Sequence, residues 1–318
     1  MPPQTIDLVI SSGDPQTDAS LARLISEQAP AYRVAVAASA AECRERFARA
    51  RVILAWGVPA TAFDYAGQLE WLQIIGTGVD AVVPAQERLR GVTVTNVRGV
   101  FGAAIAEYVV AYVLAHFQRI PRIVEQQRRH AWEPFAPLRF TGKTVGIAGL
   151  GSVGTEIAKR AAALGAHAIG VRRTAAPAAS VERVYALDEV AEFFAHCDVL
   201  VLALPATAQT QNFMSLERLA LLKPDCFVVN VGRGSALPAA NLIAALERGL
   251  IAGAAIDVFE EEPLPPESPL WNCPGVFITP HVSGINRPED VAPPILENLR
   301  RFAAGEPLCS VVDLERGY

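Results

Sequence analysis

Short apolar runs alternate with helical periodicity along the first part of the chain. Apolar runs of strand length occur at 6–10, 34–36, 52–56, 74–75 and 92–96, and helical stretches at 19–28 and 40–50. Strands separated by helices are typical of a parallel sheet with helices on its faces. The pattern therefore predicts an α/β sheet in this region.

A second alternating series follows a long helical stretch. The helical pattern extends from about Ala103 to Arg129, is interrupted near Pro121, and leads into a loop rich in proline and aromatic residues. Strand candidates then occur at 144–148, 167–171, 199–204, 227–231, 252–256 and 276–279, and a last helix at 293–304. Six strands with intervening helices are typical of a complete dinucleotide-binding sheet.

The two series predict an α/β protein with two doubly wound parallel-sheet domains. Residues 99–285 contain the six-stranded series, which we predict to form a Rossmann cofactor domain. Residues 1–98 together with 286–318 are predicted to form a second domain, into which the cofactor domain is inserted. Such a chain crosses between its domains twice, which suits a cleft that opens and closes.

Composition supports a globular protein and excludes several classes. The 318 residues are 51% hydrophobic and 19% charged, which provides enough apolar side chain for full cores, and the net charge of −5 attracts neither nucleic acid nor an anionic membrane. The five cysteines form no C-x-x-C pair, which predicts reduced thiols in a cytoplasmic protein.

One segment, 99–117, is nearly apolar over the length of a membrane helix. Glu107 lies in its middle, and a carboxylate at mid-bilayer is costly. We therefore predict a buried helix or a subunit interface rather than a membrane span, with Glu107 as a buried structural acid.

A glycine-rich segment follows the strand predicted at 144–148. It reads Gly149-Leu-Gly151-Ser152-Val153-Gly154 and opens an alanine-rich helix. In a G-x-G-x-x-G loop the first glycine permits a tight turn, the second lets a pyrophosphate approach the backbone, and the third allows close contact of helix and strand. The helix N-terminus offers free N–H groups to the phosphates. The strand before the loop and the helix after it favour a dinucleotide site.

The end of the next strand indicates which dinucleotide binds. An NAD site usually places an acid about 20 residues after the first glycine, where it binds the ribose hydroxyls. Arg172, Arg173 and Thr174 stand there instead, and they offer planar and hydroxyl donors to a phosphate. The alternative is a solvated strand end. We predict NADP as the cofactor, with NAD possible.

Five further segments extend the pattern. They are IIGTGVD (74–80), NVGRGSAL (230–237), AAIDVFEEEPLP (254–265), TPHVSG (279–284) and ENLRRFAAGEPL (297–308). With them the sequence resembles the D-isomer-specific 2-hydroxyacid dehydrogenase family over nearly its whole length, most of all the glyoxylate/hydroxypyruvate reductase and 2-ketoacid reductase branches. The resemblance implies hydride transfer between NADP(H) and a small 2-keto acid or D-2-hydroxy acid, and a homodimer formed through the helix around 103–120. It also implies that the domain of 1–98 and 286–318 is a flavodoxin-like substrate domain. We predict no metal site.

Three residues with ionisable side chains follow predicted strands and match this chemistry. Arg233 stays charged and can bind a planar anion by two bonds, as a carboxylate and carbonyl require. His281 can donate a proton to the developing alkoxide. An acid in the adjacent run Glu260, Glu261 and Glu262 is predicted to orient His281 and to stabilise the imidazolium. The resemblance selects Glu262 among the three, because the family's glutamate directly precedes a proline. The resemblance implies the same three roles.

The resemblance also assigns binding positions. It implies that Leu204, Pro205 and Thr210 lie under the adenosine half of the cofactor, that Val231 and Asp257 contact the nicotinamide side, and that the amides of Thr77 and Gly78 bind the substrate carboxylate, with His281 and Arg233. For Asp257 the alternative is a strand-end cap, and for the Thr77–Gly78 segment an ordinary glycine turn.

Two other functions remain open at this point. The same fold acts on phosphite or phosphoglycerate in some enzymes. It also occurs in non-enzymatic NAD(P)-sensing, corepressor-like binding proteins, so the fold alone does not decide the function.

Overall fold

The computed structural model describes residues 5–317 and divides into two compact units. The terminal unit consists of the described residues up to 100 and from 286, and the central unit of 101–285. The predicted division was at 98/99 and 285/286. Residues 1–4 and 318, which we assigned to the substrate domain, lie outside the described residues. The function assigned to each domain stays a prediction.

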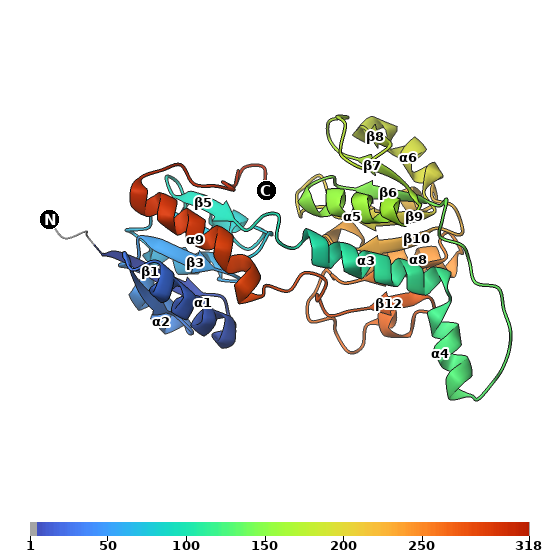
Figure 1. The fold of residues 1–318 in the computed structure, drawn as a ribbon, viewed down its shortest axis with the longest axis horizontal. Coiled ribbons are helices and arrows are strands. Elements are labelled where there is room, and N and C mark those ends of the chain that lie inside the picture. The colour runs from blue at the N-terminus through green and yellow to red at the C-terminus, as the bar shows by residue number, and fades with distance from the viewer. Residues whose placement is uncertain (1–4, 318) are drawn as a thin grey trace. The chain divides into compact units, whose positions relative to one another are not determined.

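The terminal unit contains a parallel sheet in the order β2-β1-β3-β4-β5 (Figure 1). Its strands are β1 (Ile6–Ser11), β2 (Tyr32–Val36), β3 (Val52–Ala55), β4 (Trp71–Ile74) and β5 (Thr93–Asn96). This is the flavodoxin-like strand order. The predicted fold class is confirmed for this unit.

Helices cover both faces of this sheet. They are α1 (Pro15–Gln28), α2 (Ala40–Phe47) and α9 (Pro288–Ala304), with the 3₁₀ turns η1 (Ala60–Tyr65) and η2 (Val83–Ala85). Helix α1 packs beside α9 (Figure 1). Helix α2 packs beside η1. The predicted start of α9 at residue 293 was wrong. The predicted helix began at Pro293, but Pro293 and Pro294 lie inside α9, where proline is normally disfavoured.

A buried polar network ties the C-terminal helix to the sheet of the terminal unit. Trp71 Nε1 donates to Thr95 Oγ1 over 2.7 Å, and Thr95 Oγ1 donates to Gln73 Oε1 over 2.8 Å. The same Gln73 oxygen accepts a bond of 3.2 Å from Asn298 Nδ2 in α9. All four side chains are buried, so these bonds hold α9 on a sheet built from the other end of the chain.

The central unit contains a seven-stranded parallel sheet in the order β12-β11-β10-β9-β6-β7-β8. The strands are β6 (Thr144–Ala148), β7 (His167–Val171), β8 (Arg183–Tyr185), β9 (Val199–Leu202), β10 (Phe227–Asn230), β11 (Gly253–Ile256) and β12 (Val276–Ile278). The first six strands along the chain, β6 to β11, follow the Rossmann order. The predicted fold class is therefore confirmed for this unit as well. We predicted six strands and missed β8, because it is short, lies at the edge and begins with a charged residue.

Helices flank the central sheet. They are α3 (Gly102–Phe117), α4 (Ile120–Arg128), α5 (Ser152–Ala163), α6 (Val190–His196), α7 (Leu216–Leu219) and α8 (Ala239–Glu247), with the 3₁₀ turns η3 (Leu187–Glu189), η4 (Gly234–Ala236) and η5 (Pro269–Asn272). The predicted long helix breaks between α3 and α4, where Arg119 has a positive φ of 53°. Helix α3 packs along α5.

Glu107 in α3 is not the buried acid that we predicted. Its side chain is 68% exposed and lies 3.4 Å from the guanidinium of Arg160 in α5. The surrounding apolar run concealed this, because the sequence alone does not show which helix face is covered. Within residues 5–317, the helices are all too short or too polar to cross a lipid bilayer.

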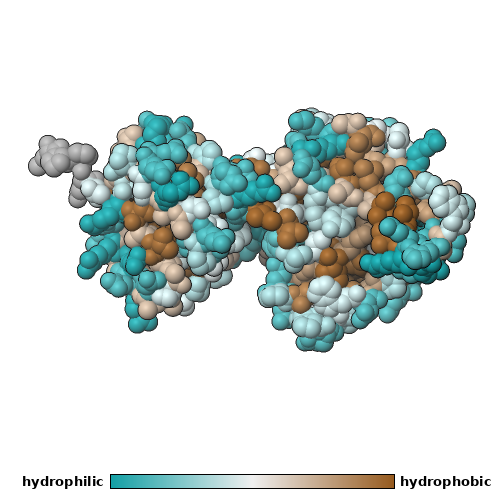
Figure 2. All heavy atoms as spheres, turned by 60° about the horizontal axis from the view of Figure 1, so that its bottom comes forward, coloured by the Kyte–Doolittle hydropathy of each residue, from teal (hydrophilic) through white to brown (hydrophobic). Residues whose placement is uncertain are grey.

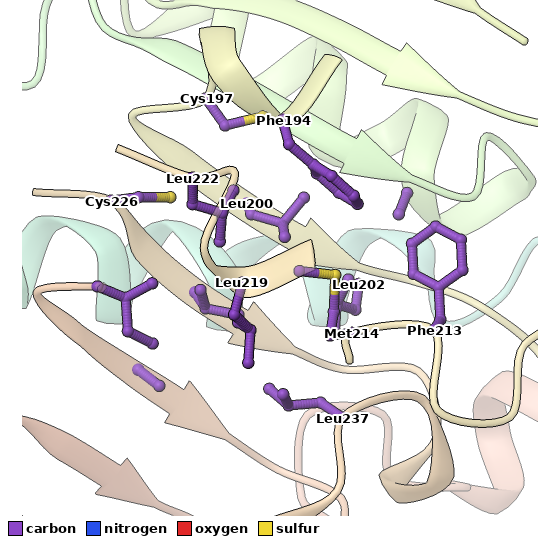
Figure 3. Close-up of a cluster of buried hydrophobic side chains, with 14 of the residues drawn as sticks. Phe194, Cys197, Leu200, Leu202, Phe213, Met214, Leu219, Leu222, Cys226 and Leu237 are labelled. Carbon is purple, nitrogen blue, oxygen red and sulfur yellow. The ribbon is translucent and has the colours of Figure 1, made fainter. Parts of the chain in front are cut away.

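The core of the central unit lies between the sheet and helices α6, α7 and α8. Figure 3 shows Phe194, Leu200, Leu202 and Met214 with their side chains directed toward one another. All five cysteines of the chain are free thiols, and three of them are buried. The surface of the central unit carries several separate hydrophobic patches between hydrophilic regions (Figure 2).

Candidate active site

The loops that carry the predicted catalytic residues lie at one edge of the central sheet. Strands β10, β11 and β12 are parallel neighbours, so their carboxyl ends share this edge. Arg233 follows β10, and Glu262 lies in the loop after β11. His281 follows β12. The glycine loop after β6 and the loop after β7 begin at the same edge.

His281 and Glu262 form a hydrogen-bonded pair. Nδ1 of His281 lies 2.8 Å from Oε2 of Glu262, and the other carboxylate oxygen accepts a bond of 2.8 Å from the backbone N–H of Phe259. A carboxylate held at both oxygens orients the imidazole, and in its ionised form it places the ring proton on Nδ1. His281 is 44% exposed and Glu262 36%. The arrangement assigns proton exchange with a ligand to Nε2.

Asp257, directly after β11, organises the loop that carries His281. Its carboxylate accepts bonds from Thr279 Oγ1 at 2.6 Å and from the N–H groups of Val282 and Ser283, each at 2.9 Å. Its backbone oxygen accepts the N–H of His281 at 2.9 Å. The side chain is fully buried. The predicted contact with the nicotinamide stays a prediction, and the bonds that the structure places on this carboxylate come from the loop.

Arg233 is carried by a tightly packed loop. The fully buried Asn230 bridges this loop, because its Oδ1 accepts the N–H of Gly232 over 3.1 Å and its Nδ2 donates to the carbonyl of Arg233 over 3.0 Å. A Cβ added at Gly234 would lie 1.9 Å from the carbonyl carbon of Phe259. The loops after β10 and β11 therefore pack directly against each other. We gave Asn230 no role from the sequence, although it opens a quoted motif.

The glycine loop has the backbone that a pyrophosphate site requires. Gly149 has φ 97°, and a Cβ at Gly154 would lie 2.0 Å from the carbonyl oxygen of Gly149. Gly151 precedes α5 in an extended conformation. Among the described residues, no side chain caps this helix end, and a Cβ at Gly151 would meet nothing within 4 Å. Ser152 and Val153 form the first turn. These residues fit the phosphates of a dinucleotide.

The loop after β7 is held by its own arginine. Arg172 Nη2 donates to the carbonyl oxygens of Ala176 and Pro177, the latter over 3.1 Å. Its Nε is buried and has no hydrogen-bond partner among residues 5–317. Arg173 and Thr174 are exposed, and residues 172–178 include no acid. The loop therefore presents cationic and hydroxyl groups where an NAD site presents a carboxylate.

The loop after β9 folds back on itself. Thr210 Oγ1 donates to the carbonyl of Pro205 over 2.5 Å and accepts the N–H of Thr207 over 2.9 Å. Leu204 is half-buried and Val231 is 8% exposed. The contacts of these residues with the cofactor stay predictions.

Thr77 and Gly78 belong to the terminal unit, where they follow β4. Thr77 Oγ1 donates to the carbonyl of Val97 over 3.1 Å, and Asn96 Nδ2 donates to the carbonyl of Thr77 over 2.6 Å. Thr77 is exposed and Gly78 half-buried. Their contact with a substrate carboxylate stays a prediction.

Comparison with known proteins adds independent findings. A family model described as "D-isomer specific 2-hydroxyacid dehydrogenase, NAD binding domain" matches residues 110–283. The chain is 31% identical over 271 residues to glyoxylate/hydroxypyruvate reductase A of Photorhabdus laumondii. The matched region covers 83% of this chain and 87% of that protein.

Solved structures match the chain over almost its full length. A D-isomer specific 2-hydroxyacid dehydrogenase from Xanthobacter autotrophicus Py2, in complex with NADPH and MES, is 34% identical, with a TM-score of 0.88 over 99% of this chain and 100% of that one. An NADPH-dependent glyoxylate/hydroxypyruvate reductase from Sinorhizobium meliloti, in complex with NADP and sulfate, is 27% identical, with a TM-score of 0.89 over 98% and 100%.

Proposed function

The chain belongs to the D-isomer-specific 2-hydroxyacid dehydrogenase family, and we propose that it is an NADPH-dependent reductase of small 2-keto acids. The observation that carries the proposal is the His281–Glu262 pair, which lies at the sheet edge that also carries the glycine loop. Such a pair is a proton donor, and the glycine loop is a site for the hydride source. The activity named for the Photorhabdus and Sinorhizobium relatives supports this proposal.

The chain's residues divide the work of carbonyl reduction. Arg233 binds the carboxylate and polarises the keto oxygen through its planar guanidinium. His281 Nε2 gives its proton to that oxygen as it becomes a hydroxyl, and the bond between Glu262 Oε2 and Nδ1 keeps the ring in place before and after the transfer. The nicotinamide, when bound, supplies the hydride to the carbonyl carbon. One hydride and one proton then account for the 2-hydroxy acid.

The choice of NADPH rests on the loop after β7. Arg172 and Arg173 carry two positive charges at the position that binds the adenosine ribose in a Rossmann sheet. A 2′-phosphate gains charge-assisted bonds there, whereas the free hydroxyls of NADH find no carboxylate within 172–178. The NADPH and NADP complexes of the two solved relatives support this choice.

We also propose that two copies associate through the helical region around 103–120. The adjoining helix α4 exposes Ile120, Ile123 and Val124 at 41%, 42% and 39%, and Trp132 beyond it is 95% exposed. In Figure 1, α4 and the segment after it extend away from the sheet of the central unit. Apolar side chains on such a projection gain free energy when a second copy covers them. Sedimentation equilibrium should give the dimer mass.

The decisive experiment is a panel of keto acids assayed with NADPH and with NADH. We expect oxidation of NADPH with glyoxylate or hydroxypyruvate, and slower turnover of pyruvate or phenylpyruvate. Phosphite and 3-phosphoglycerate, assayed with NADP, are the controls for the other reactions of this fold. Absence of turnover with every keto acid, or a clear preference for NADH, would overturn the proposal.

A further inference from the structure

A chain of hydrogen-bonded hydroxyl groups, half-buried at Tyr108 and buried at Thr279, supports the loop that carries His281. The hydroxyl of Tyr108 in α3 is 2.8 Å from Thr279 Oγ1, and Thr279 Oγ1 is 2.6 Å from Asp257 Oδ1. Thr279 is 9% exposed and Asp257 is fully buried. The chain links a helix far away in sequence to the residue that stands two positions before His281.

The protons fix the direction of these bonds. The carboxylate of Asp257 accepts three bonds, from one hydroxyl and two backbone N–H groups. The hydroxyl of Thr279 has one proton, which goes to Asp257, so in its bond with Tyr108 it is the acceptor. Tyr108 is therefore the donor, and burial raises the pKa of Tyr108, which keeps this donor protonated.

The loop that receives these bonds is under backbone strain. His281 has φ 52°, in the left-handed region that residues other than glycine rarely adopt. Such a conformation persists only where its surroundings hold it. Here Asp257 accepts the N–H groups of His281, Val282 and Ser283, one through its backbone and two through its carboxylate. Whatever fixes the Asp257 carboxylate therefore fixes the backbone directly after His281.

We propose that Tyr108 and Thr279 are positioning residues that hold the Asp257 carboxylate and, through it, the strained backbone of His281. The inference rests on the proposed function only for the consequence for turnover. The consequence for the loop itself follows from the hydrogen bonds alone. Neither residue touches the reacting atoms in this role. Their contribution is to keep Nε2 of His281 where proton transfer requires it.

The test removes single hydroxyls without removing bulk. Thr279→Val deletes the donor to Asp257, Thr279→Ser keeps it, and Tyr108→Phe deletes the donor to Thr279. Tyr112→Phe is the matched control, because Tyr112 lies one turn further along α3. Its ring centroid is 4.4 Å from that of Tyr108. Its hydroxyl forms no side-chain hydrogen bond among the described residues. Each variant is compared with the wild-type chain for melting temperature and for NADPH affinity.

The first readout is turnover of the best keto acid. We expect Thr279→Val to lower kcat about 10- to 100-fold and Tyr108→Phe roughly 3- to 10-fold, since small misplacements of a catalytic group cost up to about 100-fold. Thr279→Ser and Tyr112→Phe should stay within about twofold of wild type. KM for the keto acid and NADPH affinity should change little. In the Thr279→Val background, Tyr108→Phe should cause no further loss, because it acts through Thr279.

The second readout does not depend on activity. The backbone N–H groups of Val282 and Ser283 should exchange with solvent at least about tenfold faster in Thr279→Val and Tyr108→Phe than in wild type, Thr279→Ser and Tyr112→Phe. Unchanged exchange would overturn the positioning roles even if the enzyme is active. If exchange is faster in Thr279→Val and Tyr108→Phe but the wild-type chain reduces no keto acid, the positioning roles are supported and the proposed function is overturned instead. Additive losses in the double variant, or equal loss in Thr279→Ser, would also contradict the inference.

Discussion

Two loops at the same edge of the central sheet are held in opposite ways. The loop after β12 is strained at His281, and it is bonded along its backbone to the buried Asp257. The loop after β7 is largely exposed, and the side chain of Arg172 bonds to carbonyl groups of its own loop. Both follow a parallel strand of one sheet.

The difference reflects what each loop is proposed to do. Proton transfer depends steeply on the distance and orientation of the donor, so the loop of His281 needs a rigid support. Recognition of a phosphate depends mainly on charge, which acts over a longer range and tolerates movement. Under the proposed function, one sheet edge combines a rigid loop for proton transfer with a more adaptable loop for phosphate binding. Replacing residues of each loop, and of the β10 loop between them, tests this contrast.

The largest effect is expected at the rigid loop. His281→Ala removes the proton donor and should lower kcat by about 10²–10⁴-fold, the usual scale of acid–base catalysis. NADPH affinity, measured by fluorescence, should stay near the wild-type value, because the imidazole acts on the keto acid. Turnover near the wild-type rate would remove the basis of the comparison.

A smaller effect is expected at Arg233, beside the rigid loop. Arg233→Ala should lower kcat/KM for the keto acid roughly 10- to 100-fold, since hydrogen bonds to charged groups contribute about 1.5–3 kcal/mol. Arg233→Lys is the control that keeps the charge but loses the planar fork. If both variants bind and reduce the keto acid like wild type, Arg233 does not bind the substrate.

The smallest effect is expected at the adaptable loop. Arg172→Ala and Arg173→Ala should each lower kcat/KM with NADPH by about tenfold and leave kcat/KM with NADH nearly unchanged, because each removes one charge from the 2′-phosphate. Arg172→Ala also removes the bonds to Ala176 and Pro177, so its effect should be the larger of the two. A preference for NADPH that survives the double substitution would assign cofactor choice to another part of the chain.

Much of the fold was predictable because parallel strands buried on both faces are nearly continuous apolar runs. Strand β8 and the start of α9 were not, since a short edge strand and prolines inside a helix contradict local preferences. The exposure of Glu107 depends on what covers its helix face, which no local pattern records. The family resemblance from the spaced motifs is confirmed by the family model and by relatives that span most of the chain.

The site divides in the same way. The motifs by themselves showed the glycine loop and the lack of an acid after β7, and they predicted catalytic roles for Arg233, Glu262 and His281, because each of these is a matter of residue type and spacing. Only the tertiary structure decided that Asp257 is bonded into the loop of His281 and that Tyr108 lies behind it. Hydrogen bonds between residues so far apart in sequence form only when the sheet brings strand ends and helices together, so no local pattern of side chains could indicate them.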